Sequence, residues 1–128
     1  MSKKALILTW ESYQDHEVVY PFYRVQEEGF EVDIMANKLG RIFGILGTYN
    51  ECTQSVYDLD DDKLFDKHMN DYDLLIIPGG VKAMEKVRQN TDIINFISDF
   101  DKEKKIIACI CSGAQLLISA KVVKGRKI

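Results

Sequence analysis

The sequence predicts an α/β fold in which helices cover both faces of a mostly parallel sheet. Three short runs, 5–8, 74–77 and 106–110, contain only apolar side chains, which is typical of strands buried on both faces. Segments with apolar residues at helical spacing lie between these runs, so strand and helix alternate. The length of 128 residues fits one domain, and we expect 1–128 to form it.

The first third of the chain supplies one helix and a second strand. Apolar side chains recur at helical spacing from Val18, and Asp15 and Gly29 are suited to cap and to end that helix. Pro21 is expected to distort the first turn of the helix or to delay it. Residues 30–34 alternate between apolar and acidic side chains, which predicts the second strand.

The remaining elements are predicted by the same criteria. We interpret 40–57 as a hairpin-like excursion, and 60–69 as a short acidic helix capped by an aspartate. A further helix is expected behind Asp92. Another is expected over 114–120, after a turn at 111–113.

Composition and charge exclude several classes of protein. Hydrophobic residues make up 46% of the chain and charged residues 29%, as in globular domains rather than disordered chains. The net charge of −3 argues against a general nucleic-acid binder. Residues 101–128 hold seven basic and two acidic side chains, which we interpret as a solvated terminus, with a phosphate site as the alternative.

The sequence favours a cytoplasmic protein. No apolar run approaches the roughly 18 residues that cross a membrane, and the first apolar run is too short for a signal peptide. Three cysteines are an odd number, which fits a reducing compartment better than a disulfide framework. We therefore expect neither a membrane nor a nucleic acid as a partner.

Functional side chains are expected at one edge of the sheet. The carboxyl ends of parallel strands meet at the same edge, and reactive groups gather there. The loops predicted at that edge are 9–17, 78–85 and 111–115. They bring together acidic side chains of the first loop, two glycines of the second, Glu85 and Cys111.

Cys111 is the strongest candidate for a reactive group. It follows a buried strand and precedes a helix, with Gly113 two residues on, and such sharp turns display a nucleophile above the sheet. The unpaired N–H groups and the positive dipole end of the helix favour a thiolate there. The alternative is that Cys111 is a small buried hydrophobe. We interpret Cys109 as core and Cys52 as an accessible thiol without a role.

Glu17 and Gly80 are candidates for the rest of the site. A protonated Glu17 would donate a hydrogen bond to the sulfur; the alternative is a carboxylate favoured by the helix dipole. Backbone N–H groups of Gly80 and Ser112 would bind an oxyanion, although a glycine pair after a strand is commonly only a turn. The two histidines are poor bases for the cysteine, because we expect His16 to face away and His68 to be exposed.

Several motifs carry a resemblance that covers the whole chain in order. They are Leu8-Thr9, Asp15-x-Glu17, Tyr20-Pro21, Glu27-Glu28-Gly29, Leu75-Ile76-Ile77-Pro78-Gly79-Gly80, Glu85-Lys86-Val87-Arg88, Ala108-Cys109-Ile110-Cys111-Ser112-Gly113-Ala114-Gln115-Leu116-Leu117 and Lys124-Gly125-Arg126-Lys127. With these motifs the chain resembles the ThiJ/PfpI (DJ-type) superfamily, and especially its PfpI branch. The Pro-Gly-Gly strand end and the cysteine turn are the most specific of them.

The resemblance implies a flavodoxin-like three-layer sandwich that forms homodimers or higher oligomers. It implies Cys111 as the reactive cysteine and Glu17 as the acid that hydrogen-bonds its sulfur. It implies Gly80 and Ser112 as backbone donors to an oxyanion, and Glu85 of a neighbouring subunit as the acid that completes the site. Activities in the family include glyoxalase or deglycase chemistry on aldehydes, peptidase claims, isonitrile hydration, chaperone action and redox sensing.

Two departures from the family pattern matter. Peptidases of the PfpI branch carry Cys-His-Gly at the turn, where this chain has Cys111-Ser112-Gly113, so peptidase activity is less expected. Family members usually continue for several tens of residues past the Gly-Arg-Lys segment, adding strands and a closing helix. A chain that stops at Ile128 is expected to expose apolar sheet surface, which a partner would need to cover.

The leading hypothesis is a cysteine-dependent protein that acts on small reactive aldehydes without a metal or an organic cofactor. Cys111 would add to the carbonyl carbon, and Glu17 would move the proton. The alternative is a redox sensor or stress chaperone, in which the same thiol is oxidised to a sulfinate. A flavodoxin would need a phosphate-binding loop where the acidic loop 9–17 lies, and a receiver domain would need an aspartate near Ile77.

Overall fold

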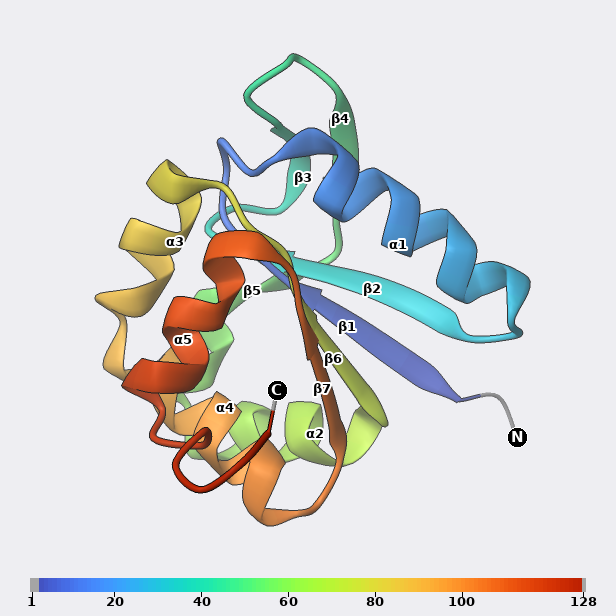
Figure 1. The fold of residues 1–128 in the computed structure, drawn as a ribbon. Coiled ribbons are helices and arrows are strands. Elements are labelled where there is room, and N and C mark those ends of the chain that lie inside the picture. The colour runs from blue at the N-terminus through green and yellow to red at the C-terminus, as the bar shows by residue number, and fades with distance from the viewer. Residues whose placement is uncertain (1–2, 128) are drawn as a thin grey trace.

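The sheet has five strands, all parallel, in the order β5-β2-β1-β6-β7 (Figure 1). The structure is a computed structural model that describes residues 3–127. The strands are β1 (Lys4–Leu8), β2 (Glu31–Ala36), β5 (Gln54–Ser55), β6 (Leu74–Ile77) and β7 (Ile106–Cys109). The predicted parallel sheet is confirmed, and each of the three apolar runs forms a strand.

Helices lie on both faces of the sheet, which confirms the predicted three layers (Figure 1). Helix α1 packs against β1 and β2, while the other four helices contact one another on the opposite face. The helices are α1 (Asp15–Glu27), α2 (Asp62–Asp71), α3 (Val81–Arg88), α4 (Thr91–Lys102) and α5 (Ala114–Ser119). Two short 3₁₀ turns, Val56–Asp60 and Cys111–Gly113, lead from β5 into α2 and from β7 into α5.

The predicted excursion is an antiparallel hairpin of β3 (Gly40–Phe43) and β4 (Tyr49–Cys52). It stands beyond the carboxyl end of the sheet, near the start of α1 (Figure 1). The chain then returns to the sheet through β5, where Gln54 pairs with Met35. This two-residue edge strand lacks an apolar pattern, and the sequence analysis did not predict it.

Two helix starts differ from the prediction. Asp15 is the first residue of α1 rather than its cap, and the cap position belongs to Gln14. Pro21 does not delay the helix, because its missing N–H affects only the bond to the Glu17 carbonyl. Helix α3 begins at Val81, inside the segment that was expected to be a loop.

Two side chains predicted to be accessible are buried. His68 is 2% exposed, because the inner face of α2 places its Nε2 at 3.1 Å from an Asp58 carboxylate oxygen. Cys52 is 3% exposed, and its thiol lies 3.1 Å from the carbonyl oxygen of Gln54. Burial raises the pKa of the Cys52 thiol, so this cysteine is a core residue rather than an accessible one.

One part of the sheet is left bare on the face that carries α1. Ile106 is 69% exposed, and an apolar groove of about 310 Å³ lies beside it. The groove is lined by Tyr20, Pro21, Arg24, Val25, Leu74, Ile76, Ala108 and Ile110. We call this surface the β6–β7 strip. It is apolar sheet surface of the kind that the sequence analysis expected to be exposed.

Candidate functional site

Three of the predicted site residues converge on Gly79, just after the carboxyl end of β6. A methyl group added at Gly79 would lie 3.0 Å from Cys111 Cβ and 3.1 Å from Ser112 Oγ. It would also overlap a carboxylate oxygen of Glu17. The absence of a side chain at Gly79 therefore allows an acid, a thiol and a hydroxyl to meet.

Cys111 lies at a strained turn between β7 and α5. Its φ of +55° is in the left-handed region, which a residue with a side chain adopts at a cost of about 1–3 kcal/mol. The side chain is exposed, unlike that of a core cysteine. Gly113 closes the turn against β6, because a methyl group there would overlap the Ile77 carbonyl oxygen. The predicted display of Cys111 above the sheet agrees with this geometry.

Glu17 reaches the site from the first turn of α1. Its Oε1 accepts a hydrogen bond of 2.8 Å from the Gly79 N–H, across 62 positions of the chain. The carboxylate is half-buried. Glu17 is thus held at the edge of the cysteine turn by a backbone donor that belongs to neither α1 nor the turn.

The Gly80 N–H, predicted to bind an oxyanion, donates instead to the Ser112 hydroxyl at 3.1 Å. Gly80 itself has a φ of +108°, and a methyl group there would lie 2.8 Å from the Gln14 nitrogen. A serine hydroxyl that accepts one hydrogen bond still has a proton to donate. The Ser112 side chain is therefore a donor that the sequence analysis did not consider.

Glu85 lies apart from this cluster within the chain. It sits on α3, where both carboxylate oxygens accept from the Arg88 guanidinium, at 3.2 and 3.0 Å. This pairing lowers the pKa of Glu85. Its side chain lines a groove of about 600 Å³ together with Trp10 and Lys82. One chain therefore brings together Glu17, Gly80, Cys111 and Ser112, but not Glu85.

The contacts of Asp15 were not predicted from the sequence. This carboxylate is 1% exposed and accepts from the backbone N–H groups of Leu46 at 2.7 Å and Thr48 at 3.0 Å. The Thr48 hydroxyl donates to it as well. The signal in the sequence is faint: Asp15 precedes Glu17 by two residues, and no local pattern connects it with the hairpin.

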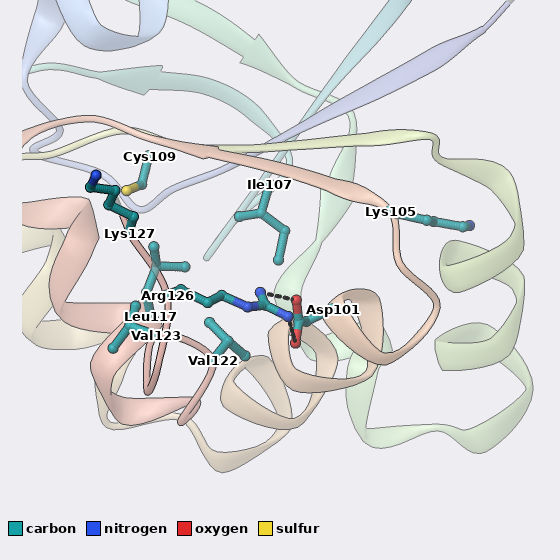
Figure 2. Close-up of a pocket in the computed structure, with 9 residues that line it drawn as sticks. All are labelled: Asp101, Lys105, Ile107, Cys109, Leu117, Val122, Val123, Arg126 and Lys127. Carbon is teal, nitrogen blue, oxygen red and sulfur yellow. Dashed lines mark hydrogen bonds and ion pairs between the residues drawn. The ribbon is translucent and has the colours of Figure 1, made fainter.

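Cys109 lines a different cavity, on the face of β7 that carries α4 and α5 (Figure 2). This cavity of about 310 Å³ is bordered by Arg126, whose guanidinium lies 2.5 Å from an Asp101 oxygen. Burial raises the pKa of the Cys109 thiol. The carboxylate of this cavity, Asp101, is paired with Arg126 rather than with the thiol.

Neither histidine takes part in the cluster, since His16 is exposed and His68 pairs with Asp58. Among residues 3–127, no three potential ligand side chains are grouped to hold a metal ion. No helix in that range is both long and apolar enough to span a bilayer. The chemistry available at the cluster is therefore that of a thiol, a carboxyl group and a hydroxyl.

Comparisons with known proteins identify the family of this chain. The model of the DJ-1/PfpI family matches residues 3–128. The chain is 39% identical to Deglycase PH1704 of Pyrococcus horikoshii over 125 residues, which are 97% of this chain and 69% of that protein. It is 38% identical to Deglycase PfpI of Pyrococcus furiosus, with the same two coverages, so it spans about two thirds of these relatives.

The fold also matches solved structures. A two-domain protein of Anabaena variabilis with DJ-1/ThiJ/PfpI-like and ferritin-like domains superposes with a TM-score of 0.84 at 24% identity. The match covers 98% of this chain and 34% of that one. At this identity the likeness establishes the fold alone.

Proposed function

Because the chain belongs to the DJ-1/PfpI family, we propose that it is a cysteine-dependent protein that acts on small reactive carbonyl compounds through Cys111. The reaction is of the glyoxalase or deglycase type. The observation that carries the proposal is the meeting of Glu17, Cys111 and Ser112 around Gly79. The Pyrococcus relatives named as deglycases support the substrate class.

The first step is addition of the Cys111 thiolate to an aldehyde carbon. A sulfur–carbon bond forms, and the electron pair of the carbonyl π bond moves to oxygen. Glu17 takes the thiol proton of Cys111 as the thiolate forms, passes this proton to the oxygen and becomes a carboxylate again. The Ser112 N–H and hydroxyl donate to the oxygen while its negative charge develops, and the Gly80 N–H orients that hydroxyl.

The second step uses the carboxylate that the first step produced. With a 2-oxoaldehyde, Glu17 removes the proton from the carbon bonded to sulfur and returns it to the adjacent carbon. The hydroxyl proton on the carbon bonded to sulfur moves to the oxygen of the adjacent carbon, which leaves a carbonyl group beside the sulfur. The product is a thioester of a 2-hydroxy acid. Water then cleaves the sulfur–carbon bond and releases the acid, so that the net reaction adds one water molecule to the 2-oxoaldehyde.

The test is an assay of methylglyoxal consumption and 2-hydroxy acid formation. We expect Cys111→Ala to lower kcat/KM at least about 100-fold, as removal of a nucleophile does. Cys109→Ala is the matched control, because this thiol lies two residues away but lines another cavity. Glu17→Gln should abolish the acid step, whereas Glu11→Gln should retain activity, since Glu11 pairs with Lys38. Full turnover by Cys111→Ala would refute the mechanism.

A second candidate function is redox sensing, and the exposure of Cys111 favours it. Two equivalents of a peroxide would each give one oxygen atom to the sulfur and leave as water, which yields a sulfinate. Mild peroxide followed by peptide mass spectrometry should then show oxidation of Cys111 and not of Cys52 or Cys109. Equal oxidation of the three thiols would argue against this function.

The proposal includes that the protein acts in the cytoplasm, that it needs no metal or organic cofactor, and that it forms a homodimer or larger oligomer. In such an assembly, Glu85 of a neighbouring copy completes the site. Its bond to Arg88 then has to exchange for a contact across the interface. Glu85→Gln is expected to lower turnover in the oligomer and to leave the alkylation of Cys111 in the dissociated chain unchanged.

A further inference from the structure

Asp15 is a buried carboxylate that belongs to the same helical turn as Glu17. Its two oxygens accept three hydrogen bonds, all from the loop that joins β3 to β4: two from the N–H groups of Leu46 and Thr48, and one from the Thr48 hydroxyl. Burial would raise the pKa of Asp15, but the bonds from Thr48 and Leu46 outweigh it and lower this pKa below 3.8. The group is therefore an ion that the hairpin loop holds through these three bonds.

The hairpin loop is built to receive this carboxylate. A methyl group at Gly44 would overlap it, so glycine is required there for reasons of space. The loop is also bonded to the segment that precedes α1. Ser12 donates to Phe43, and Ile45 donates to Tyr13, each at 2.9 Å. The start of α1 and the tip of the hairpin thus form one hydrogen-bonded unit.

This unit ends at the candidate site. The Gln14 N–H donates to the Gly79 carbonyl at 3.3 Å, and the Gly79 N–H donates to Glu17 at 2.8 Å. Gly80 packs directly against the backbone of Tyr13 and Gln14. The position of Glu17 relative to the cysteine turn therefore depends on where the first turn of α1 is held.

We propose that Asp15 is a positioning residue: by fastening the first turn of α1 to the hairpin loop, it holds Glu17 against Gly79 and beside Cys111. This inference rests on the proposed role of Glu17. Asparagine cannot replace the carboxylate, because its NH₂ group would face an N–H group that now donates a hydrogen bond to Asp15. The hairpin, which carries no reactive group of the site, is in this way part of its support.

The test is a double-mutant cycle with Asp15→Asn and Glu17→Ala, read by the rate of iodoacetamide alkylation of Cys111. Cys109→Ser is included in every variant so that Cys111 is the only thiol in its peptide. We expect Asp15→Asn to slow alkylation about five- to tenfold at neutral pH, because the thiolate loses a well-placed hydrogen-bond donor. In the Glu17→Ala background the same change should have no effect on the rate.

Three control variants separate positioning from stability. Thr48→Ser keeps the hydroxyl and should keep the rate, whereas Thr48→Val should slow alkylation in the same way as Asp15→Asn. Asp33→Asn also removes a carboxylate that accepts from two hydroxyls, those of Tyr72 at 2.6 Å and Thr53 at 3.0 Å. It should lower the urea midpoint without changing the alkylation rate, and all rates are measured where each variant is folded.

The result that would overturn the inference is a loss of stability in Asp15→Asn and Thr48→Val with an unchanged alkylation rate. Equal slowing with and without Glu17 would overturn it as well. Alkylation needs no substrate, so the inference and the proposed function fail separately. If the double-mutant cycle shows coupling between Asp15 and Glu17 but no carbonyl compound is consumed, only the proposed function is wrong. If a carbonyl compound is consumed but the cycle shows no coupling, only the proposed role of Asp15 is wrong.

Discussion

At the scale of single residues, the candidate site depends on glycines, whose missing side chains leave space for polar groups. Gly79 leaves room for Glu17, Cys111 and Ser112, and Gly44 leaves room for the Asp15 carboxylate. The strained φ of Cys111 lies at the turn between β7 and α5, where the residue stays exposed. Small residues therefore bring the polar ones within contact distance.

The three thiols are expected to differ in reactivity in the order Cys111, Cys109, Cys52. Cys111 is exposed, Cys109 is half-buried and Cys52 is buried, and burial raises the pKa of the last two. Timed alkylation at pH 7.5 with peptide mass spectrometry should label Cys111 at least about ten times faster than Cys52. Comparable labelling of all three would contradict the geometry of the turn.

The stability that Asp15 contributes should depend on pH. Its pKa is lower in the folded chain than its ordinary value of 3.8, so this contribution is complete above that value and is lost as the pH falls below it. Asp15→Asn is expected to lower the free energy of unfolding by about 1–3 kcal/mol at pH 7, and by less near pH 3. Urea unfolding at both pH values measures the difference; a constant difference would mean that the charge is not involved.

At the scale of elements, the cysteine turn is supported by its contact with β6. Gly113 has an ordinary helical φ of −57°, so its backbone conformation suits any residue. Space alone excludes a side chain, since a methyl group would overlap the Ile77 carbonyl oxygen and lie 2.9 Å from that of Pro78. The turn is thus packed directly against the carboxyl end of β6.

Gly113→Ala is expected to destabilise the protein by about 3 kcal/mol, because either the turn or β6 has to move. Gly29→Ala is the matched control: its φ of +92° costs a side chain only about 1 kcal/mol, and nothing lies within 4 Å. Urea unfolding measures both variants. The alkylation rate of Cys111 should change in Gly113→Ala alone. Similar changes in stability and alkylation rate in both variants would argue against the contact between the turn and β6.

At the scale of the whole molecule, the β6–β7 strip does not fit a parallel sheet covered on both sides. Strands of such a sheet are normally buried on both faces, yet Ile106 is 69% exposed on an edge strand. Charged residues are absent from 106–110, so no side chain protects this edge from pairing. The strip is thus the surface at which we expect the proposed oligomer to form.

Ile106→Glu is expected to shift the protein towards a smaller species in sedimentation velocity, because a charge on the strip opposes its burial. Ile118→Glu provides the control, as this side chain is 66% exposed on α5 and lies outside the strip. Sedimentation of Ile106→Glu that is unchanged from the unmodified chain would exclude the strip as the contact.

Much of the fold was predictable because the main strands can be recognised from a few consecutive residues. The apolar runs that became β1, β6 and β7 need no distant information, since a short run without polar residues is buried wherever it lies. Helix α3 was missed because the glycine pair before it indicated a loop, although Val81, Met84 and Val87 recur at helical spacing. His68 was misjudged because an acidic helix suggests exposure, while its partner Asp58 lies on another element.

By itself the sequence determined the alternation of strands and helices and the turn that displays Cys111, because these depend on neighbours in the chain. Only the tertiary structure decided which groups meet there. The bonds of Gly79 to Glu17, Gly80 to Ser112 and Thr48 to Asp15 join residues 62, 32 and 33 positions apart. Such bonds form when parallel strands align their carboxyl ends and the hairpin folds over them, and no local pattern encodes that alignment.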